Sequence, residues 1–338
     1  MTDAATGSQG PVQRIVAIVV THNRQAQLAD TVTRLLAEPV DHVVVVDNAS
    51  SDGTADWLAS VNDLRLMALR LTENRGGAGG FAEGMRLAMA QFDPDWLLVM
   101  DDDAWPEPGA VARFRAMDKA GSGGVAAAVY KTDGGICDMN RPSVNPFWHP
   151  EAFLKTLTGG GRMGFHLPDV AYQGAGVLPI DAASFVGLFL SRAAIATTGL
   201  PDGRLFIYGD DVLYTLSMRR AGIKLLFAPD LRFRHDFKTF DGQSRAFRPL
   251  WKTYYHHRNL MLVYRSAAGW LFWPALLLIL PKWLLKARHY GTDRNLYLRL
   301  LTLAVTDALR GNLTRSHVEV MGRAAGAASD GSDTPRSA

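Results

Sequence analysis

Three adjacent aspartates, Asp101-Asp102-Asp103, directly follow the apolar run Trp96–Met100. Neighbouring carboxylates repel one another unless a cation neutralises them. In an extended segment residues i and i+2 point the same way, so Asp101 and Asp103 can share a target while Asp102 faces away. Carboxylate oxygens suit Mg²⁺ or Mn²⁺, which bind one or two carboxylates together with phosphates. A solvated acidic turn is the alternative, but after a buried strand we favour a cation site.

Three other positions offer an acceptor, a base and an imidazole. Asp47 ends an apolar run and suits either a turn or helix cap, or an acceptor for a ribose hydroxyl or a base. Asp210-Asp211 stands at a predicted helix start, where the helix dipole favours carboxylates and where one of them could take a proton from a hydroxyl. His235 stands alone in Arg232-Phe-Arg-His235-Asp236, and its spacing by itself predicts a structural histidine.

The segment Asn74-Arg75-Gly76-Gly77-Ala78-Gly79-Gly80 predicts a glycine-rich loop ahead of a helix over Phe81–Gln91. Backbone amides in such a loop can approach phosphate or sugar closely, and a flexible turn is the alternative. A dinucleotide fingerprint would follow the first strand. Here the first strand is followed by Thr21-His22-Asn23-Arg24 instead, which disfavours a nicotinamide-dependent reductase.

Alternating strands and helices must position these groups. Continuous β-branched runs predict buried parallel strands, and the intervening stretches have helical spacing. Such a pattern predicts a mostly parallel sheet covered on both faces, with ligands beyond the carboxyl ends of its strands. The predicted strands are 14–20, 43–46, 66–71, 96–100, 183–191 and 224–228, and the predicted helices are 25–37, 54–60, 81–91 and 212–221. Thr21–Arg24, Asp47 and Asp101–Asp103 should therefore meet at one edge of the sheet.

Length and composition limit the remaining possibilities. The 338 residues suit one large domain with an appended region, and the single cysteine, Cys137, excludes an intramolecular disulfide or a cysteine-cluster zinc site. The start of the chain has no signal-peptide pattern. We predict disordered tails at 1–11 and 324–338, a catalytic domain at 12–240 and a basic helical region at 241–323.

The predicted C-terminal region is basic and partly very apolar. Residues 241–315 carry 12 Lys and Arg against 3 Asp and Glu, whereas the rest of the chain carries 24 against 30. Ala267–Pro281 is uncharged, and Trp270, Trp273, Trp283 and several cations stand in it or beside it. This pattern favours an interfacial helix on an anionic membrane surface. A buried helix, or contact with a second copy of the chain, is the alternative.

Four segments in order resemble family 2 inverting glycosyltransferases of the GT-A fold. They are Val19-Val-Thr-His-Asn-Arg24, Val45-Val-Asp-Asn-Ala-Ser-Ser-Asp-Gly53, Asn74-Arg-Gly-Gly-Ala-Gly-Gly-Phe81 and Trp96-Leu-Leu-Val-Met-Asp-Asp-Asp103. The closer likeness is to bacterial galactofuranosyltransferases and rhamnosyltransferases of cell-wall and surface polysaccharides. Leu205-Phe-Ile-Tyr-Gly-Asp-Asp211 and Tyr254-Tyr-His-His-Arg-Asn259 resemble the galactofuranosyl branch.

The resemblance implies a Rossmann-like α/β sheet flanked by helices, followed by a C-terminal helical region. It also implies a role for each matching residue. Thr21, His22, Asn23, Arg24 and Asp47 would hold the nucleotide, with Asn74, Arg75, Gly76, Gly77 and Asp102 at the donor; Asp101, Asp103 and His235 would bind Mn²⁺ or Mg²⁺; and Asp211, or as second choice Asp210, would be the base.

The implied reaction moves a sugar from a nucleotide-diphosphate donor to a lipid-linked glycan at the inner face of the cell membrane. UDP-galactofuranose is the expected donor and dTDP-rhamnose the alternative. A nucleotidyltransferase is disfavoured, because it would need a basic glycine-rich loop directly after the first strand, and this sequence has none there. A nucleic-acid-binding protein is a more distant alternative, because the C-terminal cations are interleaved with apolar runs rather than gathered in a polar stripe.

Overall fold

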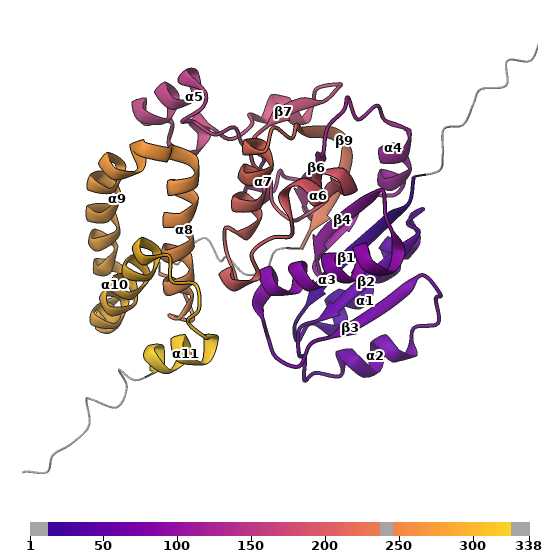
Figure 1. The fold of residues 1–338 in the computed structure, drawn as a ribbon, viewed down its shortest axis with the longest axis horizontal. Coiled ribbons are helices and arrows are strands. Elements are labelled where there is room, and N and C mark those ends of the chain that lie inside the picture. The colour runs from indigo at the N-terminus through magenta and orange to yellow at the C-terminus, as the bar shows by residue number, and fades with distance from the viewer. Residues whose placement is uncertain (1–12, 237–245, 326–338) are drawn as a thin grey trace, which may run out of the picture.

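The computed structural model describes residues 13–236 and 246–325 (Figure 1). The predicted tail 1–11 and the predicted domain boundary at residue 240 lie outside these residues. So does most of the predicted tail 324–338, of which Ala324 and Ala325 are described and end helix α11 (His317–Ala325).

The first half of the chain builds the predicted parallel sheet. Its strands are β1 (Ile15–Thr21), β2 (His42–Asp47), β3 (Leu66–Arg70) and β4 (Trp96–Asp101). They are parallel and lie in the order β3-β2-β1-β4. Helices α1 (Gln25–Leu36), α2 (Thr54–Ser60) and α3 (Gly76–Phe92) connect them. The β-branched runs of β1 and β2 are buried on both faces, which is why they read as continuous apolar strands.

Beyond β4 the sheet becomes mixed. Strand β8 (Leu188–Ser191) is antiparallel to β4, and the path continues through β6 (Gly124–Lys131) and β9 (Leu225–His235) to β5 (Ala104–Pro106). A short strand, β7 (Leu178–Ile180), pairs with β9. The strand expected over 183–191 thus begins only at Leu188, and the one expected over 224–228 runs on to His235. Alternating burial along Leu231, Phe233 and His235 explains the extension, since period-two burial is the mark of a strand.

Helices cover both faces of this sheet and make two hydrophobic layers. Side chains of β1 alternate between them: Ile15, Ala17 and Val19 enter one layer, and Val16, Ile18 and Val20 the other. The first layer is closed by α1 and α4 (Ala110–Ala116). The second is closed by α3, α6 (Arg192–Thr198) and α7 (Asp210–Arg220). The sheet ends are thereby held rigidly at one edge, where the candidate site lies.

A helical region stands beside the sheet (Figure 1). It consists of α8 (Lys252–Ala268), α9 (Phe272–Lys286), α10 (Arg294–Arg310) and α11, with its own core around Met261, Phe272, Trp283 and Tyr297. Helix α5 (Pro150–Lys155) lies over the corner between α8 and α9. Short helical turns occur at Asp138–Asn140, Thr156–Gly160, Gly161–Gly164, Asp169–Tyr172, Gly203–Leu205, Gly269–Leu271, Ala287–His289 and Gly291–Asp293.

The apolar run 267–281 begins at the end of α8 and fills most of α9. Helical residues continue from Lys252 to His289, a stretch whose length and composition would allow one membrane span. The chain reverses at Gly269–Leu271, however, so α8 and α9 lie side by side (Figure 1). The 15 residues of α9 extend about 22 Å at the usual helical rise, short of the roughly 30 Å hydrocarbon core of a bilayer. This geometry is that of a helical hairpin rather than a single span.

Candidate active site

The polar ends of β1, β2 and β4 meet at one edge of the sheet, as the sequence predicts. The strand register pairs Thr21 with Asp47, and Val20 with Asp101. The Thr21 hydroxyl donates to Asp102 Oδ2 at 2.6 Å. Three segments separated by dozens of residues therefore form one continuous rim, because parallel strands present their carboxyl ends on the same side.

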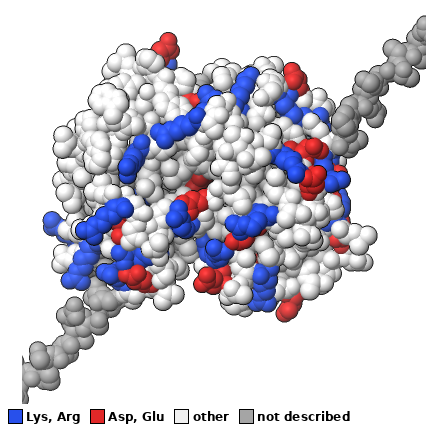
Figure 2. Space-filling view, in the orientation of Figure 1, with Lys and Arg blue, Asp and Glu red and all other residues white. Residues whose placement is uncertain are grey.

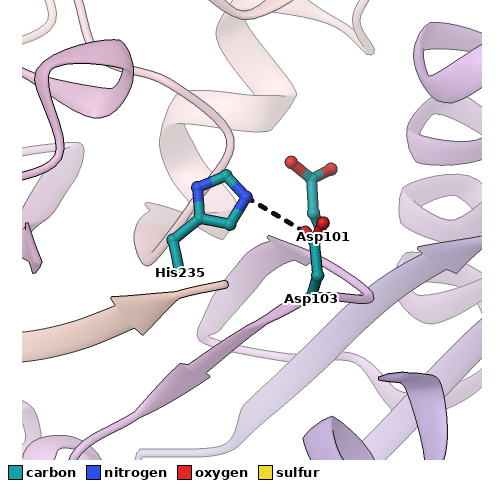
Figure 3. Close-up of side chains that lie close together, drawn as sticks. All are labelled: Asp101, Asp103 and His235. Carbon is teal, nitrogen blue, oxygen red and sulfur yellow. Dashed lines mark hydrogen bonds and ion pairs between the residues drawn. The ribbon is translucent and has the colours of Figure 1, made fainter. Parts of the chain in front are cut away.

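A carboxylate–imidazole cluster sits on this rim. Asp101, Asp103 and His235 each offer a ligand atom, and these atoms lie within 4.8 Å of one another (Figure 3). Strand β9 delivers the histidine, because it runs to His235 and pairs that residue with Ala104 of β5. His235 Nε2 lies 3.0 Å from Asp103 Oδ1, and its Nδ1 lies 2.8 Å from Asn140 Oδ1. The histidine that looked structural from its local spacing thus belongs to the cluster, and Asn140 orients it.

The charges of the cluster are unbalanced. Burial, and then the nearby charge of Asp103, raise the pKa of Asp101 to about 7. Burial also tends to raise the pKa of Asp103, but its bonds to His235 and Arg24 outweigh burial and lower it. Burial alone would lower the pKa of His235, yet the hydrogen bond to Asp103 and the charge of Asp101 raise it to about 10. A divalent cation bound by the two carboxylates would displace the proton of the His235 imidazolium, because a ligating histidine is neutral. Two carboxylate oxygens and an imidazole nitrogen are then a fitting donor set for Mn²⁺ or Mg²⁺.

Asp102 faces away from the cluster, as the alternation of side chains predicts. It accepts from Thr21 and lies 3.3 Å from Arg24 Nη1, and the same guanidinium donates to Asp103 Oδ2 at 2.6 Å. Arg24 keeps 40% of its side chain exposed while it bridges these two carboxylates. It is therefore a cation of this rim that a bound anion can reach.

His22 and Asn23 lie on the loop beside Arg24, where they hold the chain after β2. His22 Nδ1 lies 2.8 Å from the Asn48 carbonyl oxygen. The Asn23 backbone N–H donates to Ser50 Oγ, and Asn23 Oδ1 accepts from the Ser51 N–H. The structure thus gives these two residues a positioning role that sequence reasoning missed.

Asp47 lies beside a hollow that also was not anticipated from the sequence. Its Oδ1 accepts from the Ser50 N–H at 2.8 Å. Its Oδ2 is buried without a hydrogen bond, although Arg70 Nε lies 3.5 Å away. Ala49, Arg70, Leu71 and Thr72 line a hollow of 340 Å³, and the N–H groups of Ala49 and Leu71 both donate to the Asp47 carbonyl oxygen. The sequence could have indicated this hollow, because Arg70 ends a strand of the parallel sheet at the same edge as Asp47.

The glycine-rich segment is not a loop, which corrects the expectation for 74–80. Helix α3 begins at Gly76 rather than at Phe81. A Cβ on Gly80 would lie 2.4 Å from Val20 Cγ1, and one on Gly84 would lie 2.7 Å from Ile18 Cγ2. These glycines let the helix lie directly on β1, so close packing explains them better than contact with phosphate.

Other members of the segment have partners within the protein. The Gly76 N–H donates to Asn74 Oδ1, and the Arg75 N–H donates to Asn48 Oδ1. The Arg75 guanidinium pairs with Glu83. Gly77 is partly exposed, and a Cβ there would meet nothing within 4 Å. Asn74, Arg75 and Gly77 stay at least partly exposed, so they are the members that a ligand at this helix start can contact.

Asp210 and Asp211 open α7 on the far side of the cluster. Asp211 stays partly exposed, and its Oδ1 accepts from the Val212 N–H. Its charge is close enough to raise the pKa of Asp101. Burial raises the pKa of Asp211 to about 6 and raises that of Asp210 further above its ordinary value. Asp211 is thus the less buried of the two carboxylates, and a pKa of about 6 leaves it mostly ionised at neutral pH.

A groove of 620 Å³ runs along α7 and α8. Asp210, Tyr214 and Ser217 line one side of it, and Leu262, Arg265 and Ser266 line the other. The groove combines apolar, hydroxyl and charged groups, and of the two aspartates Asp210 lines it.

Comparison with known proteins agrees with this arrangement. Residues 16–172 match the model of glycosyl transferase family 2. Galactofuranosyltransferase GlfT1 of Mycobacterium tuberculosis (strain ATCC 25618 / H37Rv) is 31% identical over 228 residues, which cover 66% of this chain and 70% of that protein. Galactofuranosyltransferase GlfT2 of Mycolicibacterium smegmatis is 31% identical over 275 residues, which cover 75% of this chain and 40% of GlfT2.

Solved structures share the fold at low sequence identity. GalNAc-T7 with UDP, GalNAc and Mn²⁺ superposes with a TM-score of 0.52 at 14% identity, covering 75% of this chain and 48% of that one. The mannosyltransferase PcManGT from Pyrobaculum calidifontis, in complex with GDP-Man and Mn²⁺, gives 0.50 at 19% identity, covering 94% and 80%. With its GT-A sheet and its identity to GlfT1, the chain belongs to glycosyltransferase family 2.

Proposed function

We propose that this glycosyltransferase moves galactofuranose from UDP-galactofuranose to a lipid-linked glycan with inversion at the anomeric carbon. The observation that carries the proposal is the cluster of Asp101, Asp103 and His235 at the rim of the sheet, with Asp211 near enough for its charge to raise the pKa of Asp101. The donor sugar is suggested by the relatives GlfT1 and GlfT2, whose names state galactofuranosyl transfer.

Asp101, Asp103 and His235 are the residues that would hold the divalent cation. When bound there, the cation acts as a Lewis acid that neutralises charge on the leaving diphosphate. Arg24 adds a partly exposed positive charge beside the cluster, and Asp47 Oδ2, which accepts no hydrogen bond, suits a ribose hydroxyl or a base N–H. The hollow at Arg70–Thr72 then takes the nucleotide, on the side away from α7.

Asp211 is the residue that would accept the proton of the acceptor hydroxyl as its oxygen attacks the anomeric carbon. A single displacement inverts that carbon. A pKa of about 6 leaves Asp211 ionised at neutral pH and makes it a stronger base than an exposed aspartate. Burial, and then the charge of Asp211, raise the pKa of Asp210 well above its ordinary value, and Asp210 is the more buried of the two, so Asp211 is the better candidate for this role.

The test combines a donor panel with a base variant. The wild-type protein with Mn²⁺ is assayed for transfer and slow hydrolysis with UDP-galactofuranose, dTDP-rhamnose and other nucleotide sugars. Turnover with UDP-galactofuranose should be the fastest, and Asp211→Asn should lose about 10²–10⁴-fold. Faster turnover with dTDP-rhamnose would replace the donor assignment, and Asp211→Asn activity within a few-fold of wild type would remove the base assignment.

The lipid-linked acceptor implies work at a membrane, and the structure offers a matching surface. Trp270, in the turn before α9, is 78% exposed, and Trp273 and Leu277 of α9 are 59% and 77% exposed. Beside the α8–α9 corner, Leu154, Leu157 and Met163 also face solvent. Residues 246–292 contain seven Lys and Arg and no Asp or Glu. Apolar side chains in a region with an excess of cations favour the surface of an anionic bilayer.

Figure 2 shows the flank over α9 as mostly uncharged. The test is flotation with vesicles of anionic or neutral lipid, comparing wild type with Trp273→Ser/Leu277→Ser. Binding should require anionic lipid and fall in the double variant, whereas Leu64→Ser, at an exposed position outside this region, should bind normally. A concentration-dependent dimer that the double variant abolishes, without vesicle binding, would instead assign the surface to a second copy.

A further inference from the structure

The segment Arg204–Gly209, just before Asp210 and Asp211, has an unusual backbone. Phe206 and Tyr208 have φ values of 68° and 70°, and Gly209 has 77°. Bulky residues rarely adopt this left-handed conformation, because the Cβ crowds the backbone. Such a conformation persists only where the surrounding structure holds it.

Two side chains of α8 hold this backbone through its carbonyl oxygens. Asn259 Nδ2 donates to Leu205 O at 2.9 Å, Ile207 O at 2.8 Å and Tyr208 O at 2.9 Å. Arg258 Nη2 donates to Leu205 O at 2.9 Å and to Arg204 O at 3.2 Å. Two neighbouring residues of a single helix thus bind four of the five carbonyls from Arg204 to Tyr208.

The remaining carbonyl, that of Phe206, faces the donor side of the site. It accepts from the Ala78 N–H at 3.1 Å, in the first turn of α3. A Cβ on Gly76 would lie 2.1 Å from the same oxygen, so a glycine is required at that contact. Asn48, next to Asp47, donates to the Gly76 carbonyl at 2.8 Å. The segment therefore lies between the predicted nucleotide side and α8.

Burial shows that the two α8 side chains are fixed. Arg258 and Asn259 are completely buried, and the Arg258 guanidinium lies over the rings of Tyr254 and Tyr255. Arg258 Nε donates to Asn259 Oδ1 at 2.8 Å, which turns the Asn259 amide nitrogen toward the carbonyls. A buried charge is weak support for stability by itself, because an apolar side chain often serves as well. The arrangement is better explained by the geometry that it imposes on the segment.

We propose that Asn259, oriented by Arg258, is a positioning residue that sets where Asp211 enters α7 and faces Asp101. It acts through the backbone of 205–208 and touches neither donor nor acceptor. The inference rests on the proposed role of Asp211 as the base. It also gives a function to the Tyr254–Asn259 motif, which the reaction itself does not use.

The test compares Asn259→Ala, Asn259→Asp and Asn259→Ser. Asn259→Ala should lower kcat about 10²-fold, the effect of a small misplacement of a reacting group. The donor KM should stay within about twofold of the wild-type value, because the variant leaves the groups that bind the donor unchanged. Asn259→Asp keeps the size but removes the donors and opposes three carbonyls, so it should be at least as slow. Asn259→Ser keeps one donor and should fall between wild type and Asn259→Ala.

Asn145→Ala is the matched control. Asn145 is also a buried asparagine whose amide donates to a backbone carbonyl of α8, that of Ala267 at 3.0 Å, but it is not bonded to 204–209. This variant should lose stability while kcat per folded molecule stays within about twofold of wild type. Hydrogen exchange of peptides covering 206–213 should accelerate in Asn259→Ala and not in Asn145→Ala.

Equal kcat in the two alanine variants would overturn the proposal, and so would unchanged exchange over 206–213. If Asn259→Ala does not fold, Asn259→Ser decides by the same two measurements. If the wild-type protein transfers no sugar from any donor, the proposed function fails. The exchange comparison still judges whether Asn259 holds the segment.

Discussion

Gly80→Ala tests why α3 is so rich in glycine. The added Cβ would lie 2.4 Å from Val20 Cγ1, whereas ordinary contacts are 3.4–4 Å. The helix or the strand must therefore move by about 1 Å within a close-packed layer, and overpacking of this kind costs about 1–3 kcal/mol. Replacing glycine by alanine inside a helix by itself raises the free energy of unfolding by about 0.5–1 kcal/mol. The expected net result is a loss of about 1–2 kcal/mol in the free energy of unfolding.

Gly77→Ala is the control in the first turn of the same helix. A Cβ at Gly77 meets nothing within 4 Å, and Gly77 is not among the residues with positive φ. This variant should gain about 0.5–1 kcal/mol, so the two single-methyl changes should differ by about 2 kcal/mol. Urea unfolding followed by circular dichroism measures both.

The same pair separates packing from ligand binding. If the donor approaches the backbone at Gly77, Gly77→Ala should raise the donor KM without any loss of stability. If Gly80→Ala proves as stable as Gly77→Ala, the packing explanation of the segment is refuted, and a role in ligand contact becomes the better account of its glycines.

Three further predictions concern charge and metal. Asp103→Asn should abolish Mn²⁺ binding measured by calorimetry, whereas Asp102→Asn should retain it, because only the former belongs to the cluster; equal affinities would contradict the assignment. Removal of divalent metal with EDTA should stop turnover, and added Mn²⁺ should restore it, as a Lewis-acid role requires; full activity in EDTA would exclude that role. Burial lowers the pKa of His257 to about 4, below its ordinary 6.5. As the pH is lowered, His257 takes up its proton at a higher pH in the unfolded chain than in the folded protein. The free energy of unfolding should therefore fall from about pH 6.5 toward pH 4. Urea unfolding measures the drop in unfolding free energy between pH 7.5 and pH 5, and this drop should be about 2 kcal/mol smaller in His257→Phe than in the wild type. An identical drop in the two proteins would contradict the low pKa.

The sequence determined the parallel half of the sheet. β1, β2 and β4 are continuous apolar runs long enough to be buried on both faces, and strand polarity places Thr21, Asp47 and Asp101 at one edge without knowledge of any contact. Alternation of side chains likewise separated Asp102 from Asp101 and Asp103. These features depend on local pattern and on rules that hold for any parallel sheet.

Only the tertiary structure decided what lies across from that edge. His235 reaches the cluster because β9 continues past Ala228 and pairs with β5, a long-range contact with no local signature. The glycines of α3 read as a loop because their reason is the surface of β1, not the conformation of their own segment. The hydrogen bonds from Asn259 to the carbonyls of Leu205–Tyr208 connect residues about fifty positions apart. A sequence records which groups are present, whereas packing between distant elements sets which of them meet.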